Sequence, residues 1–211
     1  MKKLVSCVLA VLMLASAFGF AEDGGMLAGG WQVGESANQE VMEGVNKALE
    51  GFAGTGIETD LLVGTQLVAG TNYCFLSKVT TVTATPVTNW ALVYFYIDLE
   101  GNSTMTRIQD LTNYGTELAG GFSFVDEYAE FENVEQIVNA LYTGEETFEC
   151  LRILGTQVVA GINYKMFCVR TDMDAGMLPS WALVTVYVDL EGNASIIDVE
   201  DVELSIADPI E

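Results

Sequence analysis

Two stretches of the chain repeat apolar residues every three or four positions, which is the spacing of an amphipathic helix. The first starts at Ser36 to Gln39, which has the spacing of a capping box, and it stops at Gly54. Its apolar face comprises Ala37, Val41, Val45, Ala48, Leu49 and Phe52. The second starts with an N-cap at Ser123 to Asp126 and stops at Gly144. Its apolar face comprises Tyr128, Phe131, Val134, Val138 and Leu141. We therefore expect two helices.

Each expected helix is followed by segments rich in β-branched and aromatic residues and separated by turn-forming stretches, which is typical of strands. These segments comprise residues 61–68, 72–83, 90–98 and 103–111, and then 148–158, 163–170, 181–189 and 195–202. A helix that precedes an antiparallel meander can bury its apolar face only on one face of the sheet. The predicted fold class is therefore α+β, and the segment before each helix can add a first strand.

The whole pattern occurs twice, with an offset of 91 residues. Four blocks match at this offset: Gln66–Tyr73 with Gln157–Tyr164, Leu27–Gly30 with Leu118–Gly121, Trp90–Val93 with Trp181–Val184, and Asp98–Asn102 with Asp189–Asn193. This period is too long for a solenoid unit but long enough for a domain with its own core. We predict two similar tandem domains, at residues 22–116 and 117–211.

The first 21 residues have the pattern of a secretory signal peptide. Lys2 and Lys3 precede an apolar stretch from Leu4 to Phe20, and cleavage is expected after Ala21. No later apolar run reaches the roughly 20 residues that a membrane-spanning helix needs. We expect a mature protein that is secreted or periplasmic and is not in a membrane.

Composition narrows the function further. Eight Lys and Arg against 30 Asp and Glu give a formal net charge of −22, which repels nucleic acids and anionic membrane surfaces. The chain has no His, which excludes Ser-His-Asp and Cys-His nucleophile pairs, His-ligated zinc and His general bases. Acid/base catalysis by paired carboxylates stays open, although no motif places two of them together. We expect neither an enzyme nor a cofactor or metal site.

Two cysteines are expected to face each other. Cys150 and Cys168 lie nine residues on either side of Val159 in the repeated turn, so a regular antiparallel hairpin places them opposite each other. An oxidising compartment favours a disulfide between them, and the alternative is a pair of reduced, buried thiols. By the same count Cys74 has no partner, so it is a core residue or a site of intermolecular pairing.

Three pieces of each half are expected to gather at one end of its sheet, because alternate hairpin turns share an end. They are the Gly-Gly segment, the Gln-x-Val-x-Gly turn and the loop that ends in Trp. All three have few charges and many small or apolar residues. Exposed apolar loops on so acidic a chain favour a protein partner.

These motifs resemble those of the cystatin family, which carries an N-terminal Gly, a central Gln-x-Val-x-Gly turn often followed by x-Asn-Tyr, and a late Pro-Trp pair. The resemblance covers nearly all of the expected mature chain. It implies an antiparallel sheet wrapped around one helix in each domain, and reversible competitive inhibition of papain-like cysteine proteases by loops wedged into the active-site cleft. The implied protease-binding residues are Gly29, Gly30, Gln66, Leu67, Val68, Ala69, Gly70 and Trp90, and then Gly120, Gly121, Gln157, Val158, Val159, Ala160, Gly161, Pro179 and Trp181.

The chain also departs from the family pattern. Neither half has adjacent Pro and Trp, since Pro86 is separated from Trp90 by three residues and Pro179 from Trp181 by one. The second domain follows the first directly, which makes a weaker or inactive second site an open alternative.

Each feature has a purely structural interpretation as well. The turns can be simple hairpins, the Trp residues sheet-edge packing and the Gly pairs linkers. The alternative function is a binding module for another protein or peptide that inhibits nothing.

Overall fold

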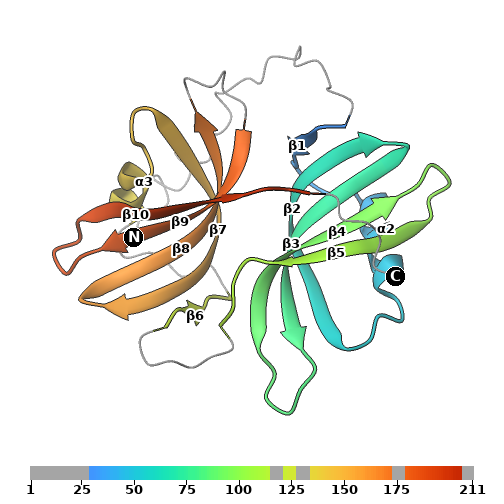
Figure 1. The fold of residues 1–211 in the computed structure, drawn as a ribbon, viewed down its shortest axis with the longest axis horizontal. Helices are drawn as coiled ribbons and strands as arrows, with labels where there is room; N and C mark the ends of the chain where they lie inside the picture. The colour runs from blue at the N-terminus through green and yellow to red at the C-terminus, as the bar shows by residue number, and fades with distance from the viewer. Residues whose placement is uncertain (1–28, 115–120, 127–133, 173–178, 206–211) are drawn as a thin grey trace, which may run out of the picture.

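The computed structural model describes residues 29–114, 121–126, 134–172 and 179–205, so the expected signal peptide lies outside the described residues. The first half contains β1 (Trp31–Val33), α2 (Gln39–Leu49), β2 (Thr55–Val68), β3 (Gly70–Thr81), β4 (Thr88–Ile97) and β5 (Ser103–Asp110). The second half contains β6 (Ser123–Phe124), α3 (Val134–Ala140), β7 (Glu146–Val159), β8 (Gly161–Asp172), β9 (Pro179–Val188) and β10 (Ala194–Val202). The elements are drawn in Figure 1.

Each half forms one five-stranded antiparallel meander, in the order β1-β2-β3-β4-β5 and β6-β7-β8-β9-β10. The 91-residue offset of the sequence recurs in the register. The first sheet has irregularities at Thr59/Leu61 and Leu62/Gly64 in β2, and the second has them at the equivalent positions of β7. Because bulges bend and twist a strand locally, the two halves share their fine geometry as well as their order. The predicted boundary between residues 116 and 117 lies outside the described residues.

The predicted α+β class is wrong, because the protein is mostly β. Strands hold 59% of the described residues and helices about 10%. The two helices are short, with 11 residues in α2 and seven in α3. The apolar residues that fill the interior lie mainly on strands, and the longest strands, β2 and β7, have 14 residues each. Sheet packed on sheet therefore dominates the architecture, and the helices are small additions to it.

The ends of the helices also differ from the expectation. The N-cap of α2 is Asn38, whose Oδ1 accepts a hydrogen bond of 2.9 Å from the backbone N–H of Val41. Ser123, expected to cap the second helix, is instead in β6, where it pairs with Thr156 of β7. A strand partner satisfies the backbone of this segment, so it does not begin a helix. The expected positions Tyr128 and Phe131 lie outside the described residues.

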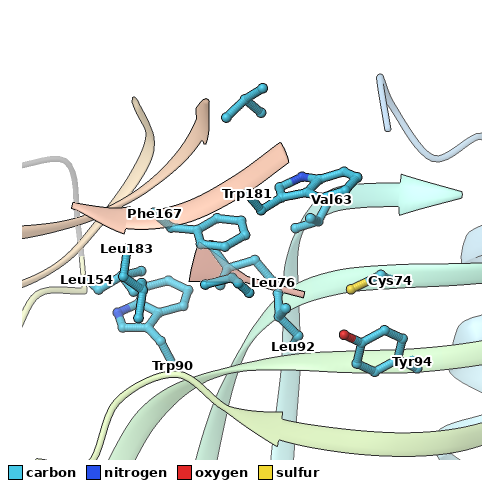
Figure 2. Packing of buried hydrophobic residues seen from close by; sticks show 12 residues of the cluster. Val63, Cys74, Leu76, Trp90, Leu92, Tyr94, Leu154, Phe167, Trp181 and Leu183 are labelled. Atoms are coloured by element: carbon cyan, nitrogen blue, oxygen red, sulfur yellow. The ribbon is translucent and has the colours of Figure 1, made fainter. Parts of the chain in front are cut away.

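One face of each sheet packs against the other sheet and forms a core that both halves share (Figure 2). We call it the shared core; its fully buried or nearly buried members include Val63, Leu76, Trp90 and Leu92 from the first sheet and Leu154, Phe167, Trp181 and Leu183 from the second. The opposite face of each sheet has its own cluster. Val41 and Val45 of α2 join Phe75 and Phe95 there, and α3 contributes Ile137 to the matching cluster of the second half.

Within the ranges given above, no helix has the length and apolar character needed to cross a membrane.

Candidate functional site: two apolar hairpin turns

The Gln-x-Val-x-Gly sequence forms the tight turn between β2 and β3, in which Val68 pairs with Gly70. At this turn Leu67 is 55% exposed and Val68 is 40% exposed. The copy between β7 and β8 has the same form, with Val158 79% exposed and Val159 44% exposed. Each half therefore presents two apolar side chains at the tip of a hairpin.

Gly70 and Gly161 are required by this geometry. Their φ angles are +124° and +131°, which residues with a Cβ rarely adopt. A Cβ on Gly70 would also overlap the carbonyl oxygen of Ile97 and the ring of Tyr96, and a Cβ on Gly161 would overlap the equivalent Val188 carbonyl. The turn is thus pressed against the neighbouring strand, β4 or β9.

Polar side chains hold the first turn in place through hydrogen bonds, which we call the lock of the turn. Asn72 Nδ2 donates to Gln66 Oε1 at 2.9 Å, and Gln66 Nε2 donates to the carbonyl oxygen of Gly29 at 2.6 Å. Tyr96 Oη donates to the carbonyl oxygen of Ala69 at the tip. Gln66 is only 6% exposed, so its side chain holds the turn and is not part of the contact surface.

The second turn repeats this lock. Asn163 Nδ2 donates to Gln157 Oε1 at 2.7 Å, and Tyr187 Oη donates to the carbonyl oxygen of Ala160 at 2.5 Å. The tyrosine locks were not identified from the sequence. The sequence did contain an indication of them, because Tyr96 and Tyr187 lie 91 residues apart at equivalent positions of the repeat.

The structure brings the leading Gly segment to the first turn, as the sequence predicted. The carbonyl oxygen of Gly29 accepts the hydrogen bond from Gln66. Both Gly29 and Gly30 are exposed. The strand β1 begins directly after them, at Trp31, and pairs with β2. In the second half, Gly120 lies outside the described residues. Gly121 is exposed and precedes β6, which pairs with β7 close to its turn.

The structure does not bring the Trp residues to the turns. Trp90 pairs with Lys78, eight residues along β3 from Gly70, or about 27 Å at the rise of an antiparallel strand. The loop before Trp90 joins β3 to β4, so it lies at the opposite end of the sheet from the β2–β3 turn. Trp90 is 0% exposed and Trp181 is also buried, both within the shared core. Pro179, at the start of β9, is exposed, but it is at the same far end.

The loop that does lie beside each turn was missed. Ile97, the last residue of β4, pairs with Thr71, so the β4–β5 turn of residues 98–102 is next to the β2–β3 turn. Leu99 on this turn is 81% exposed, and Leu190 on the equivalent β9–β10 turn is 80% exposed. The sequence signal was available, because this turn is one of the four repeated blocks and alternate turns share an end of the sheet.

An aspartate anchors each of these neighbouring turns. Asp98 Oδ1 accepts hydrogen bonds from the backbone N–H groups of Glu100 at 2.9 Å and Asn102 at 2.8 Å, and Oδ2 accepts one from Asn102 Nδ2 at 2.9 Å. These hydrogen bonds lower the pKa of the Asp98 carboxyl, and the bond from the Asn102 side chain has the largest effect. Asp189 makes the same contacts, and its pKa is lowered for the same reason. The exposed leucines are therefore on well-ordered turns.

Cys150 and Cys168 lie opposite each other as predicted, but the regular hairpin centred on Val159 is wrong, because the turn pairs Val159 with Gly161 and two irregularities in β7 bring the cysteines together; no disulfide joins them. Cys150 of β7 is directly opposite Cys168 of β8, and both are free thiols, as is the buried Cys74. A hydrogen bond to Cys150, together with burial, raises the pKa of the Cys168 thiol. Burial likewise raises the pKa of the Cys74 thiol. The pair thus corresponds to the alternative of two reduced thiols.

The described part of the chain contains no group of three or more Cys, Asp or Glu side chains arranged to hold a metal ion. Comparison of the chain with protein-family models and with curated proteins found no match in either case. The site is therefore defined by its geometry alone. In each half, a rigid apolar hairpin turn lies beside a second turn that carries an exposed leucine.

Proposed function

We propose that the protein is an exported, reversible inhibitor of papain-like cysteine proteases that inserts its hairpin turns into the active-site cleft. The observation that carries this proposal is the apolar Gln-x-Val-x-Gly turn, which resembles the central turn of the cystatin family and is held by the same Asn–Gln and Tyr hydrogen bonds in both halves. Export rests on the signal-like pattern of residues 1–21.

The physics of binding supports this use of the turn. A turn that its own hairpin already holds in place loses little conformational entropy when it binds. Leu67 and Val68 supply apolar area, and the neighbouring Leu99 and the exposed Gly29 segment widen the contact. Such a surface can block a cleft without presenting an extended chain for cleavage, so inhibition is competitive and reversible.

The buried Trp residues change the expected contact surface. Since Trp90 and Trp181 are within the shared core, the proposed site consists of the Gly segment, the Gln-x-Val-x-Gly turn and the leucine-bearing turn. In this proposal Leu99 and Leu190 make the apolar contact with the partner that the resemblance implied for Trp90 and Trp181.

The direct test is titration of a papain-like protease with the purified chain. We expect tight, reversible loss of activity, and removal of the apolar tips by a double Val68→Asp and Val159→Asp substitution should weaken inhibition at least tenfold. Val82→Asp is the matched control, because Val82 is 72% exposed on the β3–β4 loop at the far end of the sheet. Absence of inhibition against several such proteases would refute the proposal.

A second candidate is a binding module that inhibits nothing. It is favoured by the burial of Trp90 and Trp181 away from the turns, because an aromatic anchor commonly contributes much of the binding energy. Calorimetric titration alongside the activity assay separates the two candidates. Binding without loss of activity would favour the module.

A further inference from the structure

We propose that one chain holds two protease molecules at once, one at each end; this inference rests on the proposed function and extends it to stoichiometry. The starting point is that each half has both turns of the proposed site. Both copies have the hairpin turn with its tyrosine lock and the neighbouring turn with its exposed leucine.

The two copies lie at opposite ends of the molecule. In Figure 1 the β2–β3 and β4–β5 turns project from one end of the long axis, at the right. The β7–β8 and β9–β10 turns project from the other end, at the left. A partner that covers one set of turns therefore leaves the other set open.

The distance between the ends is sufficient for two proteases. Gly70 lies six residues along β3 from Leu76 of the shared core, and Gly161 lies six residues along β8 from Phe167. At about 3.4 Å per residue, each tip lies roughly 20 Å along its strand from the shared core. A protease of about 200 residues has a diameter of roughly 40 Å. Since the tips point away from each other, two bound molecules of this size extend in opposite directions.

The connection between the ends is fixed by contacts across the shared core. Figure 2 shows Trp90, Leu76, Phe167 and Trp181 between the two sheets. Around this core, Arg152 forms an ion pair with Asp60, and Lys78 Nζ lies 2.6 Å from Asp126 Oδ1. The two sites are thus rigidly linked.

The two sites should also bind independently. None of the contacts described above that lock the first turn involves a residue of the second half, and the converse holds for those of the second turn. Binding of a protease at one turn therefore does not alter the contacts that hold the other turn. The two binding steps should show no cooperativity.

The test measures the mass of the complex by sedimentation velocity with excess papain-like protease. We expect one chain with two proteases for the wild type and for the Val82→Asp control. At a protease concentration that saturates only unsubstituted turns, Val68→Asp alone and Val159→Asp alone should each give one chain with one protease, and the double variant should bind none. Both substitutions are at exposed turn positions, and thermal unfolding checks that each variant is folded; Val68→Ser and Val159→Ser replace them if one is not.

The possible outcomes separate the two proposals. A wild-type complex of one chain with one protease, with inhibition intact, would overturn the inference and leave the proposed function standing. Loss of all binding in either single variant would do the same, because only one turn would then be active. A wild type that binds no protease would overturn both proposals.

Discussion

Single residues below the turn determine its shape, although a partner would not reach most of them. Gln66 and Asn72 form a side-chain pair beneath the hairpin, and Tyr96 binds the carbonyl oxygen at the tip. The equivalent residues of the second half make the same bonds. Because the lock is found twice in one chain, it is a property of the repeat and not of one hairpin, and these side chains should control the rigidity of both turns.

Replacing Tyr96 by Phe should loosen only the first turn. The substitution removes one hydrogen bond, with a net value of about 1 kcal/mol, and should speed amide exchange of residues 67–71 roughly fivefold. Tyr187→Phe should do the same for residues 158–162, so each variant is the control for the other. Hydrogen exchange measures both, and unchanged exchange at both turns would show that the tyrosines do not hold them.

Replacing Gly70 by Ala should destabilise the protein by more than about 2 kcal/mol. The φ of +124° at this position is strained for a residue with a Cβ, and the new Cβ would meet the Ile97 carbonyl and the Tyr96 ring. Gly101→Ala is the matched control, because Gly101 also has a positive φ, +81°, but nothing lies near its Cβ position. Its cost should be about 1 kcal/mol. Urea unfolding compares the two variants, and equal losses would contradict the steric argument.

At the scale of elements, the strands and their turns could be predicted from the sequence better than the helices. The Gln-x-Val-x-Gly hairpin follows from local pattern, because the residues that make it are close in sequence. The register of Cys150 and Cys168 depends in addition on two irregularities in β7 that the sequence did not indicate. The prediction that Ser123 caps a helix was wrong, because its strand partner Thr156 is 33 residues away. Local pattern cannot weigh a distant strand against a helix cap.

The β4–β5 turn should depend on the charge of Asp98. Because the folded pKa of Asp98 is lowered, its contribution to stability is present above the unfolded pKa of about 3.9 and is lost as the pH falls through the lower folded value. At pH 7, Asp98→Asn should speed amide exchange at residues 100–102. Glu100→Gln removes the same charge from the same turn without removing the anchor, so it should leave exchange unchanged. Equal effects of both variants would indicate a general charge effect.

At the scale of the whole molecule, the shared core makes the two halves one packed unit. This could not be foreseen from the repeat, since each copy read alone places Trp90 or Trp181 at the start of a strand with no indication of what covers it. The buried position of both Trp residues is decided by the other half. The expected Trp contact with a partner failed for this reason.

The shared core predicts that both halves unfold together. Leu76→Ala removes a fully buried side chain from the first sheet and should lower the free energy of unfolding by about 2–5 kcal/mol. Hydrogen exchange in urea should show slow-exchanging amides of both sheets losing protection at the same, lower urea concentration. Retention of wild-type protection by β8 and β9 would show that the halves are independent.

The described residues on either side of the connection between the halves make contacts that hold them in place. The Thr112 Oγ1 accepts a hydrogen bond of 2.9 Å from the Trp90 backbone, and the Tyr114 ring packs edge-on against Phe124. In return, Arg107 of β5 donates hydrogen bonds to Ser205, beyond β10.

The peptide bond between the halves is therefore not what keeps them together. If a cleavage sequence is introduced between Tyr114 and Gly121 and cut after folding, the two fragments should elute as one species in gel filtration and separate only in denaturant. Fragments that separate without denaturant would contradict this expectation. If the two fragments of the cleaved chain stay associated, one of them can be exchanged in denaturant for a labelled or altered copy. The two halves would then work as a split protein that reassembles from its fragments.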